Sequence, residues 1–262
     1  MNNKMTEKLY WENGYKGAGM RMDLPNIDSF RQLPMRRIVS LIERLDLSGK
    51  KILEIGAGNS KVLVWLAKRN NNARQFSGLD YTENGCDSLA RKAAAHFLNI
   101  KVIQADLFSL DGQLPDRHDV IYSIGFVEHF RDLSEVMNTF RCLLSSGGVV
   151  VTIIPNIRGV PGFLTRILNR DVYDLHNPHS LFSLRKGHEE AGMKILDSGY
   201  LCSTNFGVLS SCVSSKYTVK WFIYISLAIF SRLLWIFEKY TGDLFHSKYV
   251  SPYIYVVAKN DT

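Results

Sequence analysis

The sequence predicts an α/β fold organised around a parallel sheet. Between residues 50 and 154, short runs rich in β-branched residues alternate with segments that suit helices. The first run ends at Ile55 and breaks at once into a glycine-rich turn, which is typical of a buried parallel strand that meets a helix whose N-terminus faces a ligand. This alternation indicates right-handed crossovers, with helices on both faces of the sheet.

The elements within this stretch are placed by periodicity and by the residues that interrupt it. Helix-forming residues follow the glycine turn directly, and each later strand is a short apolar run bounded by polar or turn-forming residues. The expected order is helix Val62–Lys68, strand Gln75–Asp80, helix Cys86–Phe97, strand Ile100–Gln104, strand His118–Ser123 and strand Val149–Ile154.

The segments on either side of this stretch are less regular. Residues 1–49 are expected to form an N-terminal segment, with a mobile lid at Tyr10–Glu12 and Gly14–Gly19 and a helix over Ser29–Leu45 interrupted near Pro34. Residues 50–262 form the main domain. After Pro155 it is expected to contain helix Phe163–Leu168, helix Ser183–Ala191, strand Met193–Leu201, a long insertion over 203–250 and strand Ser251–Lys259.

Composition is that of an ordinary globular protein: 262 residues suit one α/β domain with elaborations, and 46% of them are hydrophobic. The four cysteines lack the spacing of a zinc site or a disulfide framework, so no metal site is expected. Cys86 and Cys142 are expected to be buried in helices. The N-terminal residues lack an apolar signal-peptide core, which predicts a cytoplasmic location.

The net charge of +7 and the isoelectric point near 9.2 are compatible with nucleic acid, an anionic membrane surface or phosphorylated substrates as partners. However, no dense basic run with interleaved aromatic residues is present, so we expect no nucleic-acid partner. The basic residues are instead scattered as pairs: Arg36-Arg37, Lys50-Lys51, Lys68-Arg69, Arg91-Lys92 and Arg185-Lys186.

The pattern Glu54-x-Gly56-x-Gly58 predicts a cofactor site, because glycines let the backbone approach a ligand closely. A nicotinamide or flavin fingerprint would carry a third glycine where Lys61 stands, which argues against a dinucleotide. A tight turn between strand and helix without any ligand is the structural alternative.

This pattern resembles motif I of the class I S-adenosylmethionine-dependent methyltransferases, and further landmarks follow in the order of that family. Asp80 ends the second expected strand and Asp106 follows the third. The segment Ile124–Phe130 looks like the V-L-E-H-L signature of small-molecule methyltransferases of the ubiquinone-biosynthesis type. Leu143–Gly148 resembles the L-x-P-G-G turn, with Ser146 where proline is usual. The resemblance covers about residues 50–154.

The resemblance implies a seven-stranded, mostly parallel Rossmann-like sheet, in which the last two strands pair antiparallel and the seventh lies beside the fifth. It also implies S-adenosylmethionine as cofactor, with Asp80 accepting from the ribose hydroxyls and Asp106 from the adenine amino group. The expected cofactor-binding residues are Glu54, Gly56, Ala57, Gly58, Asp80, Tyr81, Asp106, Leu107 and Ser123. The Asx/Ser-Pro-Pro-aromatic turn of nucleic-acid amino methyltransferases is replaced by Ser123–Phe126.

The expected reaction is methyl transfer to a hydroxyl of a small molecule or a lipid-linked glycan. A hydroxyl acceptor benefits from a general base, for which histidine is suited near neutral pH. The candidates are His129, just past the fourth strand, and His176 and His179 in the loop before the sixth. Structural roles are the alternatives: His129 in the cofactor-pocket wall, and the other two in a surface turn. His96 and His188 are expected on helix surfaces.

Three further functions stay open at this point. One is methylation of a secondary metabolite or a quinone-like phenol. Another is a non-catalytic scaffold that binds S-adenosylmethionine, since a fold does not guarantee an activity. The third is a nicotinamide-linked reductase, which the missing third glycine and the Phe126–Phe130 segment disfavour.

An apolar helix is expected over Trp221–Phe237, where Arg232 is the only charged residue. This length spans ~25 Å, less than the ~30 Å hydrocarbon core of a bilayer, and Arg232 at its centre would cost about 2.5–3.5 kcal/mol. Burial against the domain or in a homodimer is therefore expected. The alternatives are a membrane span and contact of residues 219–238 with the inner membrane face, with anionic headgroups near Lys216, Lys220 and Lys239.

Overall fold

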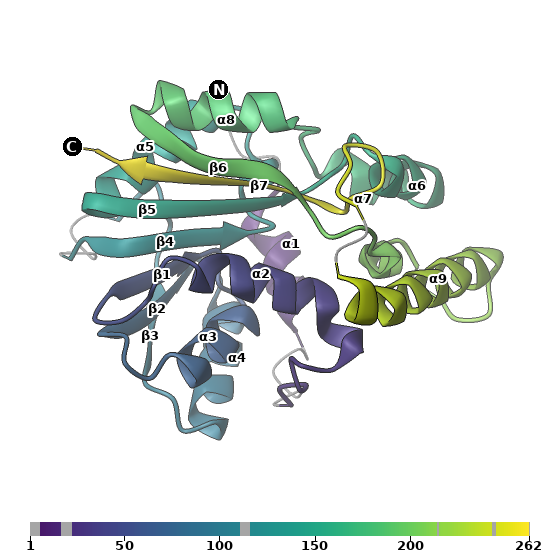
Figure 1. Ribbon diagram of the computed structural model, residues 1–262, viewed down its shortest axis with the longest axis horizontal. Helices are drawn as coiled ribbons and strands as arrows, with labels where there is room; N and C mark the ends of the chain where they lie inside the picture. Colours follow the sequence, from purple (N-terminus) through teal and green to yellow (C-terminus); the bar gives the residue numbers. More distant parts are fainter. Residues whose placement is uncertain (1–5, 17–22, 111–115, 214, 243–244, 262) are drawn as a thin grey trace.

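A seven-stranded mixed sheet forms the centre of the molecule, with the strand order β3-β2-β1-β4-β5-β7-β6 (Figure 1). The computed structural model describes residues 6–16, 23–110, 116–213, 215–242 and 245–261. Residues 17–19 of the expected lid lie outside this range. The strands are β1 (Lys51–Ile55), β2 (Gln75–Asp80), β3 (Ile100–Gln104), β4 (His118–Ile124), β5 (Leu144–Pro155), β6 (Met193–Leu201) and β7 (Tyr253–Asn260).

Helices connect these strands and cover the sheet. The α-helices are α1 (Lys8–Tyr15), α2 (Leu33–Glu43), α3 (Val62–Arg69), α4 (Glu83–Ala95), α5 (Leu133–Leu143), α6 (Val160–Leu168), α7 (Arg170–Asp174), α8 (Leu181–Glu190) and α9 (Val219–Thr241). Short 3₁₀ helices lie at η2 (Phe30–Gln32), η3 (Val127–His129) and η4 (Phe206–Cys212).

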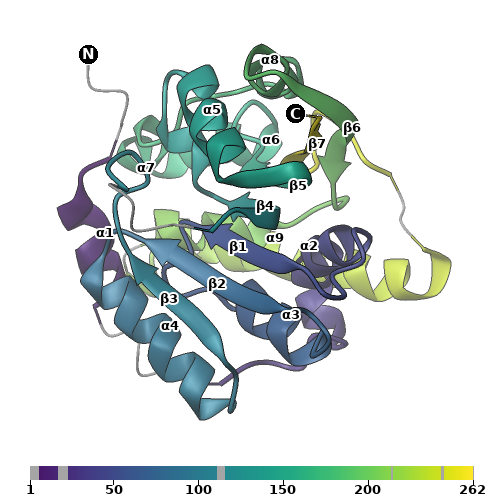
Figure 2. The same ribbon diagram turned by 90° about the vertical axis from the view of Figure 1, so that its left-hand side faces the viewer.

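The sheet topology confirms the expected fold. The first five strands run parallel, whereas β7 pairs antiparallel with both β5 and β6 and lies between them. Strands of a parallel sheet are buried on both faces, so each side chain enters one of two cores. In β1, Ile52 packs in the core shared with α2 and α3, whereas Leu53 and Ile55 pack in the core shared with α5 and α8 (Figures 1 and 2).

Several element boundaries differ from the expected ones, some of them for local reasons. The helical segment expected over Ser29–Leu45 is divided near Pro34, as predicted, into η2 and α2. Pro34 lies in the first turn of α2, where its missing N–H costs no hydrogen bond. Helix α4 already begins at Glu83, after the extended residue Thr82. Strand β5 begins at Leu144, which pairs with His118, and a register shift separates this pair from the later ones.

Two predictions of side-chain exposure are wrong. Cys142 is exposed on α5, although Cys86 is buried as expected. His188 is fully buried, because α8 turns this side chain toward the sheet. Its Nδ1 donates to the Leu184 carbonyl at 2.8 Å, and its Nε2 lies 2.9 Å from Thr152 Oγ1 in β5. A helical pattern alone does not say which of its polar side chains finds a buried partner.

Helix α9 is longer and far more exposed than the sequence predicts. Its buried residues are only Ala228, Ser231, Trp235 and Glu238, which form one narrow stripe against η4 and its surroundings. The opposite face carries large exposed apolar side chains: Phe222, Ile223, Ile229, Phe230, Leu233, Ile236, Phe237 and Tyr240. Burial of the whole helix against its own domain is therefore wrong.

By length and composition α9 is able to cross a membrane, with a mean hydropathy of 1.5 and 17% of its most apolar window buried. The sheet topology argues against a single crossing. The chain enters α9 from η4 and leaves it toward β7, which pairs with β5 and β6. One crossing would place β7 on the opposite side of the bilayer from its partners.

The buried His188 predicts a pH-dependent stability. Burial lowers the pKa of His188 to about 4 from the ordinary value of 6.5. The unfolded chain therefore binds more protons than the folded one between these values, and the free energy of unfolding falls as the pH drops through this window. This side chain alone should account for about 3 kcal/mol.

We expect His188→Gln to lower the melting temperature at pH 7 and to flatten its decline between pH 7 and pH 4.5, measured by circular dichroism. A variant whose melting temperature declines as steeply as that of the wild type would show that His188 does not contribute to this pH dependence.

Candidate functional site

The glycine turn after β1 is held by hydrogen bonds to the end of β2. The N–H groups of Gly56 and Ala57 donate to the Leu79 carbonyl at 2.9 and 3.0 Å. Gly56 has φ +72° and Gly58 has φ +38°, a region that side chains with a Cβ rarely adopt. A Cβ on Gly56 would lie 2.6 Å from Phe126 Cδ2, so only glycine fits.

Asp80 lies at the tip of β2 and is almost fully buried. Its Oδ2 accepts from the N–H of Gly58 at 2.9 Å, and its Oδ1 accepts from the N–H and the hydroxyl of Thr82 at 2.9 and 2.6 Å. Burial raises the pKa of this carboxyl, and these hydrogen bonds oppose that shift. A carboxylate oxygen can accept more than one hydrogen bond, so Asp80 also retains capacity for ligand hydroxyls.

A cavity opens between the glycine turn, the ends of β2 and β3, and η3. Five of the expected cofactor-binding residues line it, namely Gly56, Asp80, Tyr81, Asp106 and Leu107. Aromatic side chains that were not among the expected cofactor-binding residues complete the wall: Trp11, Tyr15, Phe108, Phe126 and Phe130. The glycine cradle and the buried carboxylate at its edge fit an adenosine-containing cofactor.

The other four expected cofactor residues lie behind or beside this wall. Ala57 and Gly58 belong to the turn itself, and the hydroxyl end of Tyr15 lies against Gly58. Glu54 is buried and accepts from the Tyr122 hydroxyl at 2.9 Å, and burial raises its pKa to about 8. Ser123 is fully buried, and its hydroxyl has no hydrogen-bond partner among the described residues.

Lys92 supports the glycine turn from below, a role that sequence reasoning missed. Its ammonium group donates to the Asn59 carbonyl at 3.0 Å and to the Asn59 side chain. Burial lowers the pKa of Lys92 to about 8. The sequence could have indicated this role, because Lys92 shares with Leu89 and Ala93 the face of α4 that packs against the sheet.

Helix α1 closes the cavity on the side away from the sheet. Its Glu12 carboxylate accepts from the N–H groups of Glu83 and Asn84 at 2.8 and 3.1 Å, and so caps the N-terminus of α4. Trp11 and Tyr15 of the same helix line the cavity. The described part of the expected lid, within residues 10–16, therefore lies over the cavity, whereas the mobility of the lid stays a prediction.

At the other end of the cavity, η3 is joined to the loop after α7. The Asn177 N–H donates to the Glu128 carbonyl at 2.7 Å, and His129 Nδ1 donates to the Leu175 carbonyl at 2.9 Å. His179 Nε2 donates to the Phe130 carbonyl at 2.9 Å. These bonds connect two segments that are far apart in the sequence.

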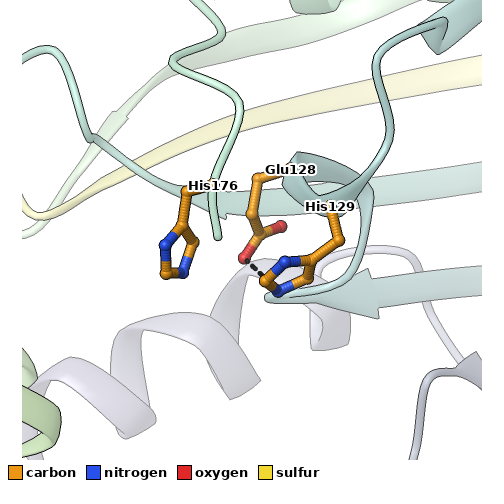
Figure 3. Close-up of side chains that lie close together, drawn as sticks. All are labelled: Glu128, His129 and His176. Carbon is orange, nitrogen blue, oxygen red and sulfur yellow. Dashed lines mark ion pairs between the residues drawn. The ribbon is translucent and has the colours of Figure 1, made fainter. Parts of the chain in front are cut away.

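This connection brings His129 and His176 together, with ring centroids 5.0 Å apart, and Glu128 lies beside them (Figure 3). His129 lines the cavity, and the Trp11 ring stands edge-on to it at 5.0 Å. Burial lowers the pKa of His129 to about 4, and it also lowers the pKa of His176. Both rings are therefore neutral at pH 7. His179 is not part of this group.

Residues 53–150 match a family model described as a methyltransferase domain. The chain is similar to methyltransferase GfsG from Streptomyces halstedii, with 26% identity over 207 residues, covering 74% of this chain and 70% of that protein. It is also similar to the ubiquinone biosynthesis O-methyltransferase of Pseudomonas fluorescens (strain Pf0-1), with 25% identity over 114 residues, or 44% of this chain. That alignment spans 48% of the relative, about half its length.

Among solved structures, the fold is similar to geranyl diphosphate C-methyltransferase from Streptomyces coelicolor A3(2), in complex with Mg²⁺, geranyl diphosphate and S-adenosyl-L-homocysteine. The TM-score is 0.57 at 14% identity, covering 86% of this chain and 79% of that chain. At this identity the likeness shows the fold alone.

The turn geometry predicts how substitutions affect the binding of S-adenosylmethionine. Asp80→Ala removes the acceptor expected for the ribose hydroxyls and also frees the Gly58 N–H, so calorimetry should show affinity weakened by about 1–3 kcal/mol. Gly56→Val should abolish measurable binding, because valine tolerates neither the positive φ nor the contact with Phe126.

Gly147→Val is the matched control, since Gly147 has a similar φ of +70° but lies in β5, outside the cavity lining. It should be less stable than the wild type and yet bind S-adenosylmethionine normally. Unchanged affinity in both Asp80→Ala and Gly56→Val would refute this cofactor site.

Proposed function

The chain belongs to the class I S-adenosylmethionine-dependent methyltransferases, and we propose that it transfers the methyl group to a hydroxyl of an acceptor held at a membrane surface. The leading acceptor class is a lipid-linked glycan. The observation that carries the proposal is the position of His129, whose ring borders the cavity that Gly56 and Asp80 also line.

When bound, the cofactor supplies a methyl group on a sulfonium, which is already a strong electrophile, so the residues around it mainly orient the acceptor and exclude water. The aromatic wall from Trp11 to Phe130 provides that exclusion. Because His129 Nδ1 donates to a backbone carbonyl, its Nε2 carries the lone pair. This nitrogen is able to accept a hydrogen bond from an acceptor hydroxyl, or to take its proton.

Helix α9 supports the choice of a membrane-borne acceptor. Figure 1 shows α6, α7 and α9 gathered at the end of the molecule toward which β4 and β5 point, the end at which the cofactor turn lies. The exposed apolar face of α9 is flanked by Lys216, Lys220, Arg232 and Lys239, and its only acidic side chain, Glu238, is buried. An apolar helix face bordered by cations suits the surface of an anionic bilayer.

A phenolic acceptor is the second candidate. The similarity to a ubiquinone biosynthesis O-methyltransferase favours it, and an aromatic-walled cavity accommodates a phenol as well as a sugar ring. Turnover of S-adenosylmethionine with a polyprenyl-diphosphate-linked sugar or with a prenylated catechol, each in vesicles, would separate the two. Methylation of nitrogen or carbon, or turnover with neither acceptor, would contradict the proposal.

His129→Ala and His176→Ala should each lower the rate at saturating S-adenosylmethionine by about 10²-fold or more, if these rings assist the hydroxyl. Cofactor affinity should change little in both, because neither ring contacts the glycine turn. His179→Ala should lose less activity, since the Nε2 of His179 is bonded to Phe130 and supports the loop. Full activity of the first two variants would remove them from the mechanism.

Membrane contact is tested by sedimentation with vesicles that contain phosphatidylglycerol. Wild-type protein should pellet with the vesicles, and less so at high salt, because screening weakens the attraction of the flanking cations. The triple variant Phe230→Ser, Leu233→Ser and Phe237→Ser should stay in solution. All three side chains are more than half exposed, so the variant should remain folded.

The matched control is Phe97→Ser with Leu196→Ser, two exposed apolar side chains outside α9 that should not affect pelleting. If the wild type ignores the vesicles and the triple variant changes from dimer to monomer in sedimentation velocity, α9 is a subunit interface instead.

A further inference from the structure

Glu128, His129 and His176 place three potential ligand atoms within 4.8 Å of one another (Figure 3). Two of the residues come from η3, and the third comes from the loop that η3 holds through the Asn177 N–H. The group adjoins the cavity: His129 and Gly125 line it, and a Cβ on Gly125 would lie 3.5 Å from Glu128 Oε1.

Both histidines use Nδ1 for a hydrogen bond to the backbone and leave Nε2 available to a ligand. His129 Nδ1 donates to the Leu175 carbonyl at 2.9 Å, and His176 Nδ1 donates to the Val172 carbonyl at 2.7 Å. A carbonyl oxygen only accepts, so each Nδ1 carries the proton and each Nε2 carries a free lone pair. Metal-binding histidines are oriented in this way, with one nitrogen bonded to a backbone carbonyl and the other on the ion.

Glu128 supplies a buried carboxyl group with an oxygen atom that is unsatisfied within the described part of the chain. Its side chain is only 2% exposed, and among the described residues its Oε2 has no hydrogen-bond partner. Its Oε1 lies 3.8 Å from His129 Nε2, too far for a hydrogen bond. A buried carboxylate without a partner is costly unless a cation compensates it.

We propose that Glu128, His129 and His176 bind one divalent transition-metal ion at the acceptor end of the cavity. Two imidazoles and one carboxylate suit Zn²⁺, Mn²⁺ or Fe²⁺ and leave further coordination positions open. The inference rests on the proposed function and refines it: the two rings would act as ligands, and the ion would lower the pKa of the acceptor hydroxyl. The proton of the hydroxyl leaves to solvent, its oxygen forms the bond to the methyl carbon, and the carbon–sulfur bond breaks with its electrons remaining on sulfur.

Sequence spacing predicts no such site, because the ligands come from segments separated by α5, β5, α6 and α7. The test uses full-length protein stripped with a chelator and titrated with Co²⁺, whose visible absorption reports its coordination. Wild type should bind one equivalent. Glu128→Gln and His176→Ala should each weaken binding by about 10-fold or more, and the matched control His96→Ala, a histidine at the C-terminal end of α4, should bind as wild type does.

Absence of Co²⁺, Zn²⁺ and Mn²⁺ binding by the wild type would overturn the proposal. Equal Co²⁺ affinity in a Glu128→Gln, His176→Ala double variant that is folded by circular dichroism would do the same. S-adenosylmethionine affinity, measured on the same stripped samples, keeps the two proposals apart. The affinity for S-adenosylmethionine should persist without metal. Its loss in the stripped wild type would contradict the proposed cofactor site, independently of the result for metal binding.

Discussion

The hydrogen bonds that tie the turn after β1 to the end of β2 are the constraint on which the site depends. Leu79 receives two turn N–H groups, and Asp80 receives a third from Gly58. Adjacent parallel strands bring these ends together without any long-range folding of loops. Asp80 of β2, Lys92 of α4 and Tyr15 of α1 each contact this turn from a different element. The shape of the cavity therefore depends on the sheet that fixes the turn.

The end of the cavity at His129 is built in another way. There, no strand places the functional groups; a 3₁₀ turn and a loop hold each other through main-chain carbonyls. Because the histidine rings donate to those carbonyls, their protonation pattern is set by the backbone and not by solvent. These bonds hold the backbone around Glu128 in place, although it lies in a short 3₁₀ helix and not in a regular strand or α-helix.

The strands and the glycine turn were predictable, because strand burial and turn chemistry are local and leave a pattern in neighbouring residues. The antiparallel pairing of the last two strands was implied by the family resemblance alone. The predictions failed where a side chain depends on a partner distant in the chain. His188 is buried because its ring has a hydrogen-bond partner in Thr152 of β5, and Lys92 is buried because its ammonium group donates to the Asn59 carbonyl. The grouping of His176 with Glu128 depends on a loop whose path no periodicity encodes. For α9, the apolar sequence predicted a helix but did not predict which of its faces is exposed.

The placement of β7 between β5 and β6 orders events during synthesis. Helix α9 is made before β7, so an apolar helix leaves the ribosome while β5 and β6 still lack the strand that joins them. Pairing of β7 with two earlier strands is non-local and slow to form compared with a helix. In that interval the nascent chain exposes the apolar face of α9 together with the strand edges that β7 later covers, a combination that makes an incomplete chain prone to aggregation.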